Sequence, residues 1–369
     1  MQSEIKISKR KLREYFSTFY NADVKIDYVG ELGKKTEKAS EMELKGFGYG
    51  KPYLIEFTMD GKNKSVVLET LRVGGGFGHD HFSDRAQVLI WQHSVFNRLP
   101  KHVRSVDVGA FTVNGGLKSV GDCTEYFIVT ELVEGQLYHL DLDRIKEQKQ
   151  LSQLDLDRCR ALSDYLVSIH KVKENAPELY VRRIRDLVGH GECIFGLTDS
   201  YPDKLSYIGE SDFVEIEKKC IEWRWKLKHK AHRLSQVHGD YHPWNILFRE
   251  GTDFTALDRS RGEWGEPADD VSALTINYLF YSLQAYGELA GSFERLFDLF
   301  WRNYLDKTGD EEVLSVVQPF YAWRGLVVAS PVWYPNLSLD VRRKLFNFIR
   351  RILEAEKLEL KEINSYFRH

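Results

Sequence analysis

The character of the chain changes near residue 135, and this change constrains the fold more than any other feature. From Asp23 to about Leu132, short runs rich in Val, Ile, Tyr and Phe alternate with turn residues, a pattern typical of β-strands. Beyond Gly135 the apolar residues recur at helical spacing over long stretches. We therefore predict an α+β protein with a small antiparallel β lobe over residues 1–135 and a larger, mostly helical lobe over residues 136–369. A chain of 369 residues is long enough for two hydrophobic cores.

Individual elements follow from the same patterns. Leu12, Phe16 and Tyr20 recur at helical spacing and predict a short amphipathic helix packed against the first lobe. The sequence DGKN predicts a hairpin turn between two strands. A helix is predicted over 85–99 and strands over 103–111 and 125–135. The longest helical stretches of the second lobe are 159–173, 213–232, 271–305 and 342–360.

Composition excludes several classes of protein. Lys and Arg total 52 against 55 Asp and Glu, and a net charge of −3 provides no general field for binding nucleic acid. No stretch approaches the roughly 20 apolar residues of a membrane span, and the first residues lack the apolar core of a signal peptide. The four cysteines stand far apart and predict reduced, mostly buried thiols. We expect a cytoplasmic protein with no nucleic-acid or membrane partner.

The residues with the clearest chemical meaning lie in the second lobe. The chain reads HGDYHPWN from His238 to Asn245, and LDRS follows, with Asp258 thirteen residues after Asn245. Apolar runs around 246–248 and 255–257 predict a hairpin, which would bring Asp240 and Asn245 beside Asp258. Phosphoryl transfer needs a carboxylate that orients the acceptor hydroxyl and oxygen ligands for magnesium. This set of side chains supplies both.

The pattern His-Gly-Asp-x-His-x-x-Asn followed by Leu-Asp-x-Ser resembles the aminoglycoside phosphotransferase and choline kinase superfamily, which has a bilobal protein-kinase-like fold. The resemblance implies that Asp240 is the catalytic or hydroxyl-positioning acid and that Asn245 and Asp258 bind magnesium. It implies that His238 braces the loop. The segment GEPADD resembles the family's Gly-Asp-Pro-Ala-x-Asp, which gives Asp270 the role of capping the next helix and supporting the catalytic loop.

The resemblance extends over nearly the whole chain. Residues 162–170 resemble the helix that precedes the catalytic segment, and 127–135 resemble the connection between the lobes. The glycine-rich segment between two predicted strands would let backbone amides approach phosphates. The nucleotide-binding residues implied in this way are Gly46, Gly48, Gly50, Glu131, Leu132 and Val133.

The third strand departs from the kinase-like pattern. Glu69 stands where these folds normally carry a lysine that pairs with nucleotide phosphates, and Gln87 replaces the usual acid on the next helix. A carboxylate facing a triphosphate is repulsive unless a cation intervenes. Either Glu69 faces another metal ion or a nearby basic residue compensates. The candidates are Lys51, Lys64, Arg72 and Arg85.

Several segments allow two interpretations. The loop 74–81, with its glycines and histidines, is a phosphate- or metal-binding element or, more simply, a lid or packed turn. The aromatic residues Trp264, Trp323, Trp333 and Tyr334 are core residues or a box for a cationic substrate. The arginines of 181–192 form a solvated helix face or recognise an anion. For Asp269 the expected role is a solvated acid at a helix start.

Together these features predict an ATP- and Mg²⁺-dependent phosphotransferase that moves the γ-phosphoryl group to a hydroxyl of a small molecule. Two alternatives remain open. A nucleotide-binding regulatory pseudokinase is suggested by Glu69, whereas a protein kinase is disfavoured because the loop reads His-Gly-Asp and no Asp-Phe-Gly follows. The sequence specifies neither the acceptor nor the oligomeric state.

Overall fold

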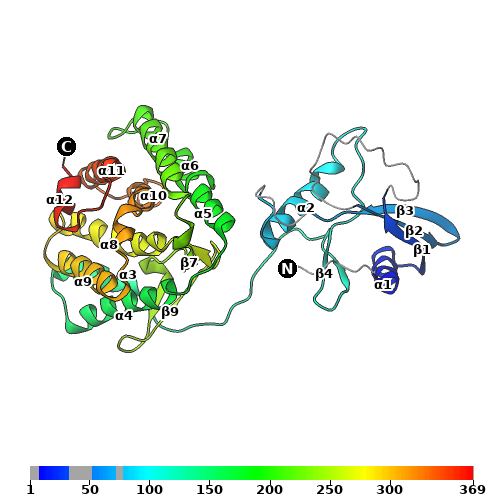
Figure 1. The fold of residues 1–369 in the computed structure, drawn as a ribbon, viewed down its shortest axis with the longest axis horizontal. Coiled ribbons are helices and arrows are strands. Elements are labelled where there is room, and N and C mark those ends of the chain that lie inside the picture. Colours follow the sequence, from blue (N-terminus) through cyan, green and yellow to red (C-terminus); the bar gives the residue numbers. More distant parts are fainter. Residues whose placement is uncertain (1–7, 33–51, 72–77, 369) are drawn as a thin grey trace. The chain divides into compact units, whose positions relative to one another are not determined.

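The computed structural model describes residues 8–32, 52–71 and 78–368. The chain forms two compact units, Met1–Thr130 and Glu131–His369. The first contains an antiparallel sheet and the second is mainly helical (Figure 1). The predicted α+β fold class, with a small antiparallel β part and a larger helical part, is confirmed.

The first unit is built around a three-stranded sheet in the order β1-β2-β3. Asp60 and Gly61 join β2 to β3 with positive φ angles of 51° and 71°, as a tight hairpin turn requires, so the predicted DGKN turn is confirmed. Helix α1 buries Leu12 and Phe16 against the sheet, where Phe16 stacks on Phe57 at 5.0 Å between ring centroids. The elements are α1 (Lys9–Tyr20), β1 (Val24–Glu31), β2 (Tyr53–Met59), β3 (Lys62–Leu68), α2 (Phe82–Phe96), β4 (Gly109–Phe111) and β5 (Leu117–Ser119).

The predicted strands at the end of this unit are mostly absent. Of 103–111 only Gly109–Phe111 is a strand, and 125–135 contains none. Phe127 and Leu132 are 90% and 91% exposed. An apolar, β-branched run forms a strand only where a neighbouring strand accepts its hydrogen bonds, and none of the described residues does so here.

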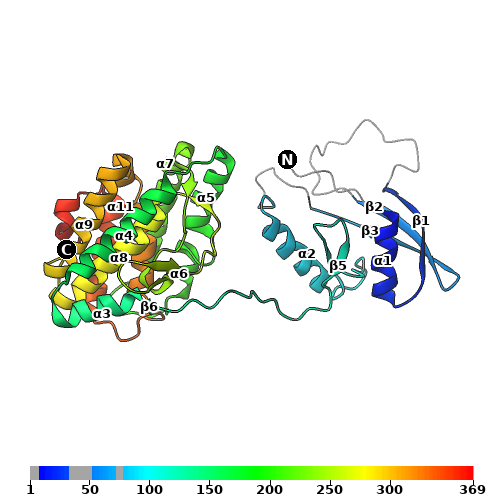
Figure 2. The same cartoon turned by 90° about the horizontal axis from the view of Figure 1, so that it is seen from below.

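The helical unit is organised around α8, which is buried along almost its entire length. It contacts α3, α4, α9, α10 and α11 (Figure 1 and Figure 2). The helices are α3 (Tyr138–Gln148), α4 (Gln153–His170), α5 (Pro177–Gly189), α6 (Ile194–Ser200), α7 (Glu210–Leu227), α8 (Pro267–Tyr286), α9 (Gly291–Thr308), α10 (Gln318–Ala329), α11 (Leu339–Glu354) and α12 (Ile363–Tyr366), with the 3-10 turns η1 (Ala231–Arg233), η2 (Pro243–Asn245), η3 (Glu311–Ser315) and η4 (Leu360–Glu362).

The predicted helical stretch 271–305 is two helices. Gly287 follows α8 in the left-handed conformation with φ 80°, which ends the helix, and α9 begins at Gly291. The short strands of this unit are β6 (Gln136–Leu137), β7 (Ser235–Gln236), β8 (Ile246–Phe248), β9 (Phe254–Ala256) and β10 (Trp264–Gly265).

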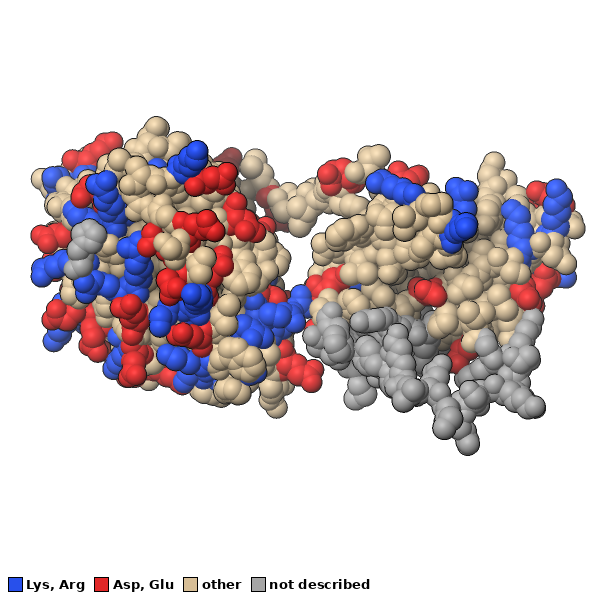
Figure 3. Space-filling view, turned by 90° about the horizontal axis from the view of Figure 1, so that it is seen from above, with Lys and Arg blue, Asp and Glu red and all other residues tan. Residues whose placement is uncertain are grey.

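Surface charge on the helical unit is mixed in sign. On the face drawn in Figure 3, basic and acidic side chains of this unit lie among one another. None of the helices in the described residues is both long and apolar enough to cross a membrane. All four cysteines are free, and Cys159, Cys193 and Cys220 are buried as expected, whereas Cys123 is exposed.

Candidate active site

The predicted hairpin of the helical unit is confirmed. Strand β8 pairs with β9 in the register Ile246 to Ala256, and the Leu257 N–H donates to the Asn245 carbonyl at 2.8 Å. Asp258 follows directly. The loop that carries Asp240 precedes β8, so the hairpin brings the predicted site residues to one end of the same structure.

Asp270, near the start of α8, holds this loop from the core. Its carboxylate accepts the backbone N–H groups of His238 and Gly239, each at 2.7 Å. His170 at the end of α4 contacts the same carboxylate at 3.1 Å and contacts Tyr304 at 2.8 Å. Burial alone would raise the pKa of Asp270, but these hydrogen bonds and the neighbouring imidazoles lower it. The contacts are those of a loop support.

His238 also faces inward. Its side chain is buried and its Nδ1 accepts the backbone N–H of Asp240 at 3.3 Å. Burial lowers the pKa of His238, which favours the neutral imidazole. Gly239 between them has φ 87°, a left-handed conformation that glycine adopts without strain. The loop is therefore held by buried hydrogen bonds on either side of a turn whose conformation suits glycine.

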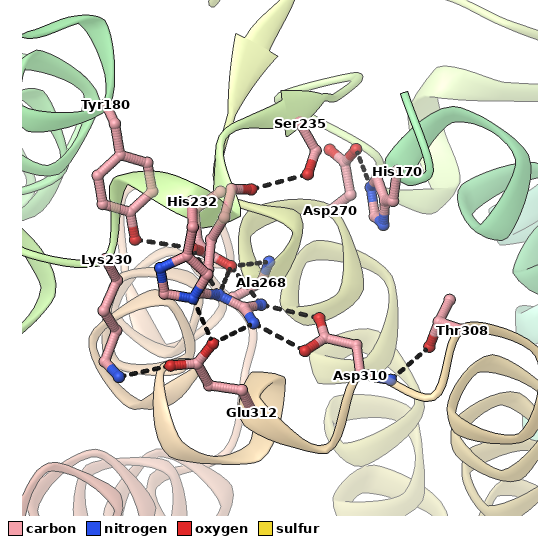
Figure 4. A network of polar contacts seen from close by, with 12 residues as sticks. His170, Tyr180, Lys230, His232, Ser235, Ala268, Asp270, Thr308, Asp310 and Glu312 are labelled. Carbon is pink, nitrogen blue, oxygen red and sulfur yellow. Dashed lines mark hydrogen bonds and ion pairs between the residues drawn. The ribbon is translucent and has the colours of Figure 1, made fainter. Parts of the chain in front are cut away.

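A second network fixes the N-terminus of α8. Arg233 binds Glu266 at 2.7 Å and Asp310 at 2.7 Å, and Tyr180 donates to Glu266 at 2.8 Å. Glu266 is the N-cap of α8 and is only 2% exposed. Figure 4 shows Tyr180 of α5 approaching this network from one side, and Asp310 and Glu312 at the start of η3 from another. The start of the helix that carries Asp270 is thereby tied to α5, η1 and η3.

Asp240 lies among positive charges. Its Oδ1 pairs with Arg324 Nη1 at 2.6 Å and Arg261 Nη1 at 2.9 Å, while Oδ2 lies 3.6 Å from His242 Nε2. Burial alone would raise the pKa of Asp240, but the two guanidinium groups and His242 outweigh it, so the pKa lies well below its ordinary value. Asp240 is thus a carboxylate held in its ionised form.

The expectation for Asp269 was wrong. Instead of a solvated helix start, its side chain is 16% exposed and forms an ion pair with Arg324. Arg324 therefore bridges Asp240 and Asp269. Burial raises the pKa of Asp269 to about 6, despite the neighbouring guanidinium groups. Asp269 and Asp270 are adjacent on α8 and therefore face different directions. The charge pattern of the sequence did not indicate that Arg324 on α10 would pair with Asp269.

Asn245 and Asp258 have the oxygen ligands that magnesium prefers. The Asn245 amide donates its Nδ2 to the Asp240 carbonyl at 3.1 Å, which leaves the amide oxygen as the atom able to coordinate a cation. Asp258 is exposed, and its φ of 55° is unusual for a residue other than glycine. In the described part of the chain no three His, Cys, Asp or Glu side chains gather to hold a metal by themselves. The pair fits a cation that also takes phosphate oxygens as ligands.

A cavity of about 650 Å³ opens beside Asp240 within the helical unit, and we call it the Asp240 cavity. Three of the aromatic residues singled out from the sequence line it, namely Trp323, Trp333 and Tyr334, whereas Trp264 does not. Trp244, in η2 of the loop that carries Asp240, also lines the cavity. The remaining walls come from the loop before α6, from α6, from α8 and from α10 with the segment after it.

Residues 112–295 match the model of the phosphotransferase enzyme family (APH), and they include the loop, the hairpin and Asp270. This part of the chain belongs to that family. The predicted resemblance to this phosphotransferase family is confirmed.

Similar solved structures include the amicoumacin kinase hAmiN in complex with AMP-PNP, Ca²⁺ and Ami, with 17% identity over 85% of this chain and 89% of that chain and a TM-score of 0.41. Choline kinase from Cryptosporidium parvum is 12% identical over 91% and 90% of the two chains, with a TM-score of 0.32. A thermostable mutant of aminoglycoside phosphotransferase APH(4)-Ia is 13% identical over 94% and 98%, with a TM-score of 0.37. No curated protein matches the chain.

Most of the first unit lies outside the residues that match the phosphotransferase family. The predicted nucleotide-binding residues Gly46, Gly48 and Gly50 lie outside the described residues, as does Arg72, a candidate for compensating Glu69. Glu69 directly follows β3 and is exposed, and Glu131, Leu132 and Val133 lie in a segment without regular structure. Their roles stay predictions.

The candidates for compensating Glu69 are partly accounted for. Lys64 lies over the Tyr20 ring at 4.8 Å, and Arg85 donates to the carbonyls of His79 and Asp80. Lys51 lies outside the described residues. In the loop 74–81, His81 caps α2 by accepting the Ser83 N–H at 3.3 Å, which agrees with a packed turn for that residue.

Sequence reasoning missed three residues of this candidate site. Arg261 and Arg324 bind Asp240, and Asn277 of α8 lines the cavity. Arg261 lies three residues beyond Asp258, so its proximity was a usable signal. Arg324 and Asn277 lie within apolar helices and belong to no motif. An Arg or Asn in the middle of a buried apolar helix is itself a signal, because such groups are rarely buried without partners.

Proposed function

We propose that the chain is an ATP- and Mg²⁺-dependent phosphotransferase that transfers the γ-phosphoryl group to a hydroxyl of a small molecule. The observation that carries this proposal is the Asp240 cavity: a space of about 650 Å³, of a size that suits small molecules, whose wall includes an ionised carboxylate. The family match supports phosphotransferase chemistry independently.

Within this proposal Asp240 positions the acceptor. Its Oδ1 binds two guanidinium groups, whereas among the described residues the ionic partner of Oδ2 is His242. Oδ2 is therefore the oxygen that would accept the hydrogen bond of the substrate hydroxyl. A carboxylate with so low a pKa is a weak base, which suits a reaction that depends mainly on positioning, because phosphoryl transfer proceeds through a loose transition state.

Asn245 and Asp258 would hold the magnesium ion. When bound, that ion neutralises charge on the phosphates of ATP. Asp270, His170 and His238 would keep the loop in place, and their buried contacts do not depend on the ligand. We also propose a cytoplasmic location, where reduced thiols persist and ATP is available.

The test is transfer from γ-labelled ATP to a panel of hydroxylated small molecules with Mg²⁺, comparing the parent with Asp240→Ala. Asp253→Ala is a matched control, because Asp253 lies in the turn of the same hairpin and pairs only with Arg249. We expect label transfer by the parent and the control and its loss in Asp240→Ala. If ATP binds but no acceptor is labelled, the regulatory pseudokinase suggested by Glu69 replaces this proposal.

A further inference from the structure

The wall of the Asp240 cavity is mainly apolar. Ile276, Val327 and Val328 form part of it from α8 and α10, and Val332 with Trp333 lies in the segment that follows α10. Val332 and Trp333 are 58% and 63% exposed, which places them at its solvent edge. An apolar surface of this kind stabilises a ligand in proportion to the apolar area that the ligand removes from water.

The charged groups on this wall give no excess of negative charge. Among the described residues they are two carboxylates, Glu192 and Asp240, and two guanidiniums, Arg261 and Arg324, beside His242. Asp240 is already paired with both arginines, and the Glu192 side chain is 63% exposed. An ammonium group that entered would lose its hydration and find both carboxylates already paired with guanidinium groups, a costly exchange.

Two aromatic residues of the wall, Trp323 and Trp244, already contact a cationic or imidazole group through a ring face. The ring of Trp323 is covered by Arg324 at 3.8 Å and by Arg261 at 4.9 Å from its centroid. Trp244 stacks on His139 with centroids 5.0 Å apart and planes at 13°. Trp323 and Trp244 therefore already bind guanidinium or imidazole groups through a ring face, which leaves Trp333 and Tyr334 as the other aromatic residues of the wall.

Three buried polar atoms of the same wall lack a partner in the described structure. They are the Nε atoms of Arg261 and Arg324, which are donors, and Oδ1 of Asn277, which is an acceptor. Asn277 uses its Nδ2 to bind the Ala273 carbonyl at 2.8 Å. Buried polar atoms normally have partners, but these three are closed off from the cavity, so they add no open polar group to its wall.

We infer that the Asp240 cavity takes a hydroxylated molecule with a large, uncharged and mainly apolar body, and that it disfavours amino alcohols and quaternary ammonium alcohols. The inference rests on the proposed function only for the placement of the hydroxyl at Asp240. The preference itself follows from the charges and apolar groups of the wall, and it holds for binding in the absence of ATP.

The experiment compares two probes of the same shape by calorimetric titration of the full chain without ATP. The apolar probe is 4-ethylbenzyl alcohol, and the cationic probe is 4-(aminomethyl)benzyl alcohol, which is protonated at neutral pH. We expect the apolar probe to bind at least about tenfold more tightly. A tenfold difference in Kd corresponds to about 1.4 kcal/mol, and burying two CH₂-sized groups contributes about that much or more. Equal or tighter binding of the cationic probe, or no binding of either probe, overturns the inference.

Variants at the solvent edge locate the effect with little risk to folding. Trp333→Ala should weaken the apolar probe by about threefold or more. Val332→Glu should strengthen the cationic probe by about twofold to fivefold, the range of an exposed ion pair. Val214→Glu is the matched control, because Val214 is 41% exposed on α7 and lies outside the cavity. Equal responses of Val332→Glu and Val214→Glu would place the binding elsewhere and overturn the inference.

The two proposals can fail separately. If the apolar probe binds as expected but no hydroxylated apolar molecule accepts label from ATP, the substrate class stands and the phosphotransferase function fails. If amino alcohols are phosphorylated efficiently while the apolar probe does not bind, the function stands and the substrate class fails.

Discussion

Asp270 and Asp240 both lie beside the turn at Gly239, one fully buried and the other partly buried, and different groups balance their charge. Asp270 is fully buried and receives two backbone N–H groups and one imidazole. Asp240 lies on the wall of a cavity and receives two guanidinium groups. Both arginines also donate to the Gly239 carbonyl, Arg324 at 3.2 Å and Arg261 at 3.3 Å, so the loop backbone keeps these contacts when the charge of Asp240 is removed.

This difference predicts that Asp270 contributes mainly to stability and Asp240 mainly to activity. Removing the charge of Asp270 should act mainly on folding, because the loop backbone loses its attachment to α8. Removing the charge of Asp240 should act mainly on activity, because Arg324 retains Asp269 as a partner. The predictions below test that separation.

Asp240→Asn should have the largest effect. We expect kcat for label transfer to fall by about 10²- to 10⁴-fold, the usual contribution of a positioned acid or base. The free energy of unfolding in urea should change by no more than about 2 kcal/mol, since Arg324 stays paired. A variant that loses stability and activity together would mean that Asp240 is a structural residue.

Asp270→Asn should show the opposite pattern. The amide can replace only one of the two carboxylate oxygens as an acceptor, and its NH₂ group would face a backbone donor. Breaking a buried charged network of this kind costs about 3–5 kcal/mol. Urea unfolding measures this loss. A change below about 1 kcal/mol would contradict the anchoring role, and Asp253→Asn on the exposed hairpin turn serves as the control.

Asp269→Asn should change how stability depends on pH. The pKa of Asp269 is raised to about 6 in the folded protein, above about 4 in an unfolded chain. The folded state therefore binds more protons between these values, and this group lowers the free energy of unfolding as pH rises from about 4 to 6, by up to about 3 kcal/mol. Subtracting the variant's profile from the parent's should reveal this slope. A flat difference would mean that Arg324 keeps Asp269 ionised throughout.

The sequence predicted the parts of this site that lie close together along the chain. The hairpin from Asn245 to Asp258 follows from the short apolar runs, whereas the supporting roles of His238 and Asp270 were implied by the family resemblance. Arg324 could not be placed in this way, because it reaches Asp240 from α10, 84 residues away, through tertiary packing alone. Asp269 was misjudged for the same reason.

Two features of the fold were also beyond the sequence pattern. The periodic stretch 271–305 contains a break that depends on Gly287 adopting a left-handed conformation. The apolar run 125–135 has strand composition but no strand partner among the described residues. In both cases local preference was consistent with more than one structure, and contacts distant in sequence decided between them.

Gly239→Ala should have the smallest effect of these variants, and it still distinguishes a loss of stability from a loss of activity. Gly239 has φ 87°, and an added Cβ would lie 3.2 Å from the Arg261 Cβ. Gly251→Ala is the matched control, because Gly251 also has a positive φ of 65° but an added Cβ there meets no atom within 4 Å. Backbone strain should lower the free energy of unfolding by about 1–2 kcal/mol in both variants. Only Gly239→Ala should also lower kcat, because it displaces Arg261 from Asp240. Equal activity of the two variants would mean that Arg261 does not help to hold Asp240.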